Sequence, residues 1–137
     1  MPTRNLTTTI NPFDKIEKGR ERFATADLAV RLIEDLRRDY WPDVNAWDAF
    51  AMTVFVRATL SINQSGRLAS VDRISRMSGI SRSTVQRRME MLHQQGAVEK
   101  RGSRFALVPE FFNAPHILEG FKRRRQMVQA VSKKLAD

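Results

Sequence analysis

The stretch SVDRISRMSGISRSTVQRRMEMLHQQG, residues 70–96, decides the fold of this chain. It contains two short runs whose apolar residues recur at helical spacing, and Gly79-Ile80-Ser81 separates them. Gly79 suits the positive φ at which a helix stops, and Gly96 suits the end of the second run in the same way. The pattern therefore predicts two helices joined by a tight turn.

The second of these helices is expected to turn Val85, Met89 and Leu92 inward, because they stand at positions i, i+4 and i+7. Its opposite face then carries Arg and Gln, which make paired hydrogen bonds to base edges, together with Ser and Thr, which suit phosphate. A serine hydroxyl before each run can cap the helix. The candidate DNA contacts here are Ser70, Ser81, Arg82, Ser83, Thr84, Gln86, Arg87 and Arg88.

A basic β-hairpin is predicted directly after the second helix. The strands are expected at residues 97–101 and 104–108, and Gly102 takes the first central position of a type II′ turn between them. Three basic residues of this hairpin complete the set of candidate contacts: Lys100, Arg101 and Arg104.

Helices are also expected before and after this unit. One should run from Thr25, or somewhat earlier, to about Tyr40, with the Thr25 hydroxyl as its cap. The next should start at Asp43 or Asn45 and continue towards residue 62; it is apolar nearly all round, which places it at the centre of the core. A last helix should cover residues 115–135, where Pro115 suits the first position.

The last helix carries Phe121, Val128 and Leu135 seven residues apart, with Arg124 interrupting the neighbouring apolar row. Such a seam is what a partner helix buries. The spacing fits a helix of a second copy and the first helix of the same chain equally well. We expect residues 1–24 to form a flexible arm, and residues 25–137 to form one domain.

The charge is distributed unevenly along the chain. Residues 65–104 have a net charge of +6, whereas residues 1–42, 43–64 and 105–137 have +1, −1 and +3. A local basic excess is typical of a protein that binds a polyanion. The basic block is the same part of the chain that contains the two short helices and the hairpin.

The segment from Ser70 to Arg87, continuing to Gly96, resembles bacterial winged helix-turn-helix domains. Those domains occur in MarR-, GntR- and IclR-type transcription regulators and in plasmid or prophage replication proteins. The resemblance implies a mainly α fold with a small β-hairpin wing, in which the helix-turn-helix occupies 70–96, the wing 97–108 and flanking helices the two ends. It also implies that the wing contacts the DNA backbone or minor groove.

Features of other protein classes are missing from the sequence. There is no cysteine, and His93 and His116 stand apart without carboxylates at metal-ligand spacing, so we expect no metal, no cofactor and no enzyme activity. No apolar run is long enough to cross a membrane, and the lack of cysteine fits a cytoplasmic protein.

We predict a regulator that binds double-stranded DNA sequence-specifically, as a homodimer through its terminal helices. The alternatives are a replication, partition or prophage accessory protein, and a winged helix that binds protein instead. A protein-binding winged helix should have an acidic or apolar face at this position, whereas this sequence has Arg82, Gln86 and Arg87 there.

Overall fold

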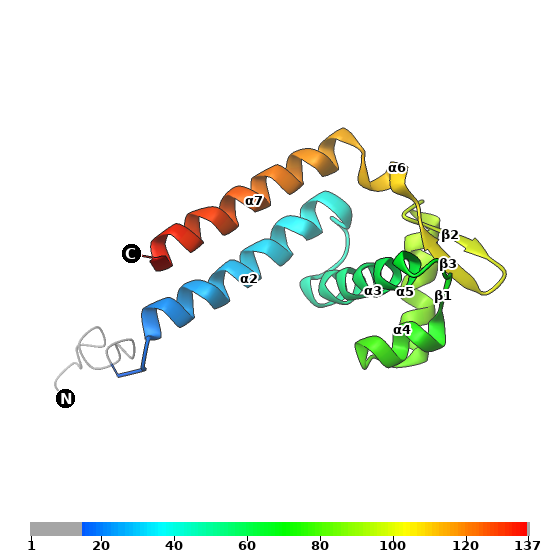
Figure 1. Ribbon diagram of the computed structural model, residues 1–137, viewed down its shortest axis with the longest axis horizontal. Helices are drawn as coiled ribbons and strands as arrows, with labels where there is room; N and C mark the ends of the chain where they lie inside the picture. Colours follow the sequence, from blue (N-terminus) through cyan, green and yellow to red (C-terminus); the bar gives the residue numbers. More distant parts are fainter. Residues whose placement is uncertain (1–14, 137) are drawn as a thin grey trace, which may run out of the picture.

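The computed structural model describes residues 15–136, which form two parts (Figure 1). One is the terminal pair, two long helices α2 (Gly19–Tyr40) and α7 (Pro115–Ala136) that lie side by side and antiparallel. The other is the winged module, a winged helix-turn-helix as the sequence predicts. It comprises α3 (Ala46–Gln64), β1 (Ala69–Ser70), α4 (Val71–Ser78), α5 (Arg82–Gln94), β2 (Val98–Arg101), β3 (Arg104–Leu107) and α6 (Pro109–Phe112).

Helix α3 runs through the centre of the winged module and begins after the second of the two predicted starts. The Asn45 side chain accepts a hydrogen bond from the Asp48 amide at 2.9 Å, which satisfies one of the first-turn donors. Asp43 lies outside the helix. The buried residues of α3 are Ala49, Met52, Phe55, Ala58, Thr59 and Ile62.

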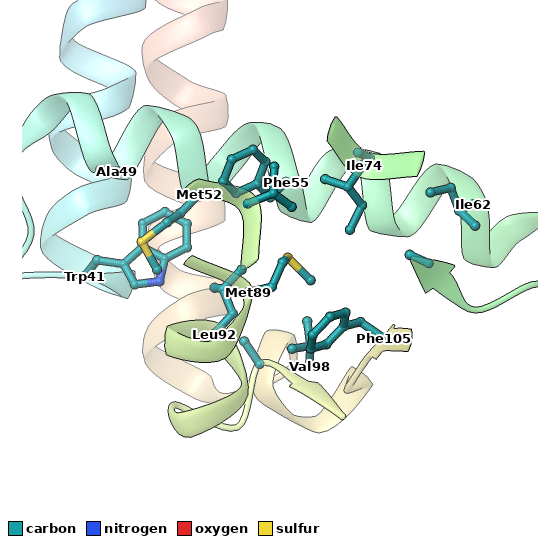
Figure 2. Close-up of a cluster of buried hydrophobic side chains, with 14 of the residues drawn as sticks. Trp41, Ala49, Met52, Phe55, Ile62, Ile74, Met89, Leu92, Val98 and Phe105 are labelled. Carbon is teal, nitrogen blue, oxygen red and sulfur yellow. The ribbon is translucent and has the colours of Figure 1, made fainter. Parts of the chain in front are cut away.

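One apolar core joins the elements of the winged module. Figure 2 shows Phe55 of α3 and Met89 and Leu92 of α5 in this cluster, together with Phe105 of β3. All four side chains are fully buried, and burial of a side chain of this size contributes about 1.5–3 kcal/mol. Val85 is buried too, so the stripe predicted for α5 is confirmed.

Side chains hold the turn between α4 and α5. Gly79 has a φ of +73°, and its amide donates to the Ser75 carbonyl. The Ser75 hydroxyl donates to the Ile80 carbonyl at 2.6 Å, and the Ile80 amide donates to the Ser78 hydroxyl at 3.2 Å. These bonds satisfy backbone groups that are otherwise left open where one helix stops. The orientation of α5 relative to α4 is therefore fixed locally.

The wing belongs to a three-stranded antiparallel sheet with the order β1-β3-β2. The sequence predicted strands at 97–101 and 104–108, and β2 and β3 are each one residue shorter. Gly102, with a φ of +63°, forms the tip between the paired residues Arg101 and Arg104. Strand β1 was not predicted, because two residues are too few for an alternating pattern.

Helix α2 begins earlier than the sequence suggested. Its first residue is Gly19, so residues 19–24 of the predicted arm are helical, and residues 1–14 lie outside the described residues. The prediction that Thr25 caps this helix is wrong. The Thr25 hydroxyl lies inside the helix and donates to the Glu21 carbonyl one turn back at 2.9 Å.

A cluster of four charged residues joins α2 to α7. Arg123 donates to both carboxylate oxygens of Asp35 and of Asp39, and Arg124 donates to one oxygen of each, at 2.8–3.2 Å. Burial opposes ionisation of Asp35, but the hydrogen bonds and charges of the two arginines outweigh it and hold its pKa below the usual value. Arg124, only 8% exposed, is thus a contact between the helices rather than an interruption.

Gly120 is required beside this cluster. A Cβ at this position would lie 1.7 Å from the Asp39 Oδ2 atom and 2.9 Å from the Arg124 Nη1 atom. The absence of a side chain therefore lets the two helices approach closely enough for the carboxylates and guanidinium groups to meet.

The terminal pair is attached to the winged module at the end of α2. Buried Trp41 donates its indole N–H to the Gln95 side chain, just after α5, at 2.8 Å. The Arg37 guanidinium donates to the carbonyls of Pro42 and Val44 in the link to α3. These bonds fix the end of α2 against the module that carries α5.

Candidate nucleic-acid interface

Helix α5 presents an exposed polar face opposite its buried stripe. Arg82, Ser83, Gln86 and Arg87 are all exposed, while Val85 between them is buried and Thr84 is partly exposed. Among the described residues, no acid pairs with Arg87. A helix with this arrangement can place its outer face in a major groove, where Gln and Arg recognise base edges.

The first turn of α5 keeps free amide donors. Ser81 occupies the predicted N-cap position, but its side chain accepts no hydrogen bond from a backbone amide, so that part of the prediction is wrong. Its hydroxyl instead donates to the Thr84 hydroxyl at 3.0 Å and lies 3.5 Å from the Ser83 hydroxyl. Backbone amides at a helix N-terminus are ready donors for phosphate.

Arg82 lies at this same end of α5 and is paired within the molecule. Its Nε atom is 2.8 Å from the Asp72 Oδ1 atom, in the first turn of α4, and both side chains are more than half exposed. A pair this exposed is worth at most about 1 kcal/mol, so a DNA phosphate can replace the carboxylate. Ser70 caps α4 by accepting from the Arg73 amide, which is a structural role.

The structure gives Arg88 a different place from the one expected for a DNA contact. Its side chain is only 12% exposed and forms an ion pair with Asp48 in the first turn of α3. Its Nη1 atom also contacts the Met91 sulfur at 3.1 Å. The guanidinium is turned towards α3 because Asp48 attracts it there. Arg88 therefore anchors α5 to α3, and we leave it out of the interface.

Glu90 connects α5 to the wing, a role that sequence reasoning missed. Its Oε1 atom accepts a hydrogen bond from the Lys100 ammonium group of β2 and another, at 3.2 Å, from the side-chain amide of Gln86. The hydrogen bond from Lys100 is the main reason why the Glu90 pKa is lowered. Ten residues and a turn separate the two partners, so no helical or strand spacing could have revealed the pair. The predicted site residue Lys100 is thereby held close to Gln86.

The other two basic residues of the wing share one face of it. Arg101 and Arg104 are directly paired across the strands, which places their side chains on the same side. Both are exposed, and Arg101 makes a surface ion pair with Glu99 at 2.8 Å. Lys100 lies on the other face, above the ring of Phe105.

The described residues offer no sign of a metal centre or a membrane span. No group of three or more His, Cys, Asp or Glu side chains among them is arranged to hold a metal ion. None of the helices in residues 15–136 combines the length and the apolar character needed to cross a bilayer.

Residues 62–102 match the family described as the IclR helix-turn-helix domain. The matched segment runs from the last turn of α3 to the tip of the wing and contains α4 and α5. This confirms the resemblance to bacterial winged helix-turn-helix DNA-binding domains for that part of the chain, and it supports DNA binding and transcriptional regulation. No curated protein and no solved structure matches the chain.

Proposed function

We propose that the protein binds specific sequences in double-stranded DNA and regulates transcription by occupying an operator. The observation that carries the proposal is the outer face of α5, where Arg82, Gln86 and Arg87 are exposed opposite a fully buried stripe. The match to the IclR helix-turn-helix domain and the net charge of +6 over residues 65–104 support it.

The proposed contacts divide into base readers and anchors. Gln86 and Arg87 stand in the middle of the exposed face and read base edges in the major groove. Arg82, Ser83, Thr84 and the first amides of α5 bind phosphates, together with the hydroxyl of Ser81. Arg101 and Arg104 bring the wing onto the adjacent backbone or minor groove.

The ion pair between Lys100 and Glu90 keeps this wing beside α5. It makes the spacing between the two contact surfaces a property of the free protein, so little reorganisation is required on binding. We infer further that two copies act together as a homodimer, since a twofold protein reads an inverted repeat through two major grooves on one face of the DNA.

A selection from random DNA duplexes followed by affinity measurements tests the proposal. The unmodified protein should enrich one motif, and Arg87→Ala should cost about 1–3 kcal/mol on that motif while relaxing the preference at one base position. Arg101→Ala should weaken binding to all sequences nearly equally. Lys134→Ala removes one positive charge from α7, outside the proposed contacts, and is the control.

Two results would contradict the proposal. Enrichment of no motif would remove sequence-specific binding, and equal losses for Arg87→Ala on selected and random DNA would remove Arg87 as a base reader. A motif found in replication origins rather than in promoters would favour an accessory role in replication.

A further inference from the structure

Helix α7 carries an exposed apolar ridge. Phe121, Val128 and Leu135 are 58%, 43% and 42% exposed, and they follow one another at intervals of seven residues. Residues at this spacing lie along one stripe of a helix, as in helices that pack against a partner. The contact with α2 uses other positions of α7, among them Gly120 and Arg124, so the ridge stays exposed after the terminal pair has formed.

Helix α2 carries a shallow apolar groove. A first hollow is lined by the small exposed side chains of Thr25, Ala26 and Ala29, and by Lys18, Glu21 and Arg22 at its other end. A second hollow shares Ala29 and continues towards the start of α3, where Trp47 is 83% exposed. The second hollow has a volume of about 290 Å³, and its other lining residues are Val30, Ile33, Glu34, Ala46 and Phe50. The two hollows together follow α2 for several turns.

We propose that the ridge of each chain packs into the groove of a second copy, so that two terminal pairs form a four-helix bundle. Ridges of large side chains pack into grooves between smaller ones, and this complementarity determines how helices cross. A twofold dimer needs a surface that is complementary to itself. Here the ridge and the groove lie on neighbouring helices of one chain. In a twofold dimer the ridge of each copy therefore packs into the groove of the other, and the same contact forms twice.

The charge cluster within one chain defines which residues of α7 lie level with which residues of α2 along the helix axes. Within one chain, Arg123 and Arg124 lie level with Asp35 and Asp39. An antiparallel α7 of a second copy at the same height places its Arg125 beside Glu34. The same register sets Val128 of that copy against Ala29 and Ile33, and Leu135 against Thr25 and Ala26.

Charges beside the ridge and the groove are complementary in this arrangement. Arg125 is four residues after Phe121 and three before Val128, so it borders the ridge. Glu34 lines the second hollow. Within the part of the chain that the structure describes, neither side chain has an ion-pair partner. A second copy supplies one for each.

The twofold axis of this dimer runs parallel to the terminal pairs. In each chain the winged module lies at one end of the terminal pair (Figure 1). Both modules of the proposed dimer therefore lie at the same end of the bundle, which is the arrangement needed for two copies of α5 to face one DNA duplex. The inference concerns the homodimer within the proposed function, but it does not depend on DNA binding, since the interface lies on the terminal pair.

Sedimentation velocity of the full chain without DNA, at tens of micromolar, tests the interface. The unmodified protein should sediment as a dimer, and Val128→Asp should give a monomer. The single reversals Glu34→Arg and Arg125→Glu should each weaken dimerisation about tenfold, because each sets like charges together. The two reversals in one chain should restore the dimer, and Lys134→Glu, an equal charge change elsewhere on α7, should have no effect.

A second measurement is independent of the stability of Val128→Asp. The chain has no cysteine, so Ala29→Cys and Val128→Cys can be prepared as separate single-cysteine proteins and mixed under oxidising conditions. A disulfide-linked heterodimer is expected in a larger excess over either homodimer than the twofold excess that random pairing gives. A monomer of the unmodified chain, a reversal without rescue, or no preference for the mixed disulfide would overturn the interface. A dimer that binds no DNA would contradict the proposed function alone.

Discussion

The winged module is held together by apolar side chains, whereas the terminal pair is joined at its centre by two aspartates and two arginines. In the module, large side chains such as Phe55 and Phe105 are buried, and the one buried polar side chain among its described residues is that of Thr59. In the terminal pair, Arg124 is buried while Phe121 and Val128 are exposed. The difference indicates that apolar burial holds the module together, while the ionic contact of the pair leaves apolar surface on α7 for a further contact.

The largest expected effect comes from the core of the module. Phe105→Ala should lower the free energy of unfolding by about 3–5 kcal/mol, because it removes a fully buried ring and leaves a cavity among α3, α5 and the wing. Urea denaturation followed by circular dichroism measures the loss. Phe121→Ala removes the same ring from an exposed position. It should lower the unfolding free energy of the monomer by less than about 1 kcal/mol, as surface substitutions usually do. Similar losses for the two variants would abolish the contrast.

The ion cluster should come second. Arg124→Ala should destabilise the protein by about 2–4 kcal/mol, because it removes the buried partner of Asp35 and leaves only the more exposed Arg123 and Arg38 beside it. Lys134→Ala, which changes a basic residue of α7 outside the cluster, is the control for the same denaturation experiment. If both variants unfold at the same urea concentration, the cluster does not hold the terminal pair together.

Two neighbouring arginines of α5 should separate stability from recognition. Arg88→Ala should cost about 1–3 kcal/mol of folding stability, because it leaves Asp48 without its partner in a half-buried position. The specific DNA affinity of the folded fraction should change little. Arg87→Ala should do the reverse, with unchanged stability and weaker binding. Thermal melting and DNA titration of both variants give the four values, and the same outcome for both arginines would contradict the assignment.

The smallest effect is a pH dependence. Because the folded-state pKa of Asp35 is lowered, its contribution to stability is present above the unfolded value of about 3.9 and is lost as pH falls through the folded-state pKa. Asp35→Asn should therefore reduce the rise of unfolding free energy with pH in the acidic range. The pKa of Glu90 is lowered as well, so the increase of unfolding free energy with pH should become smaller in Asp35→Asn but should not vanish. Glu110→Gln, an exposed carboxylate, is the control, and an identical slope for Asp35→Asn would argue against the cluster.

The elements of the winged module were predictable because their signals are local. Gly79 ends α4, Asn45 begins α3, and the stripe of α5 follows from helical spacing within thirteen residues. The errors arose where a distant or competing partner decides. The sequence places Arg88 on the flank of α5, but in the structure its guanidinium pairs with Asp48, forty positions earlier in the chain. The hydroxyl of Ser81 has a neighbouring hydroxyl as an alternative to the backbone.

In the terminal pair, the sequence shows the seven-residue spacing of α7. It does not show whether this stripe packs against a second copy or against the first helix of the same chain. The contact between α7 and α2 depends on Asp35 and Asp39 meeting Arg123 and Arg124, about 85 positions away in the chain. Charge complementarity over that distance has no periodic signature. The row with the buried arginine therefore looked interrupted, although it contains the contact that holds the helices together.

The two tryptophans of the chain provide built-in optical probes of the core of the module and of the α2 groove. Trp41 is 3% exposed, with its indole N–H bonded to Gln95, so its fluorescence should be shifted to short wavelength and protected from iodide. Trp47 is largely in water and should emit at long wavelength and be quenched readily. With Trp47→Phe and Trp41→Phe as single-probe proteins, one emission spectrum follows unfolding of the module. The other follows the covering of the α2 groove as protein concentration rises, without any label.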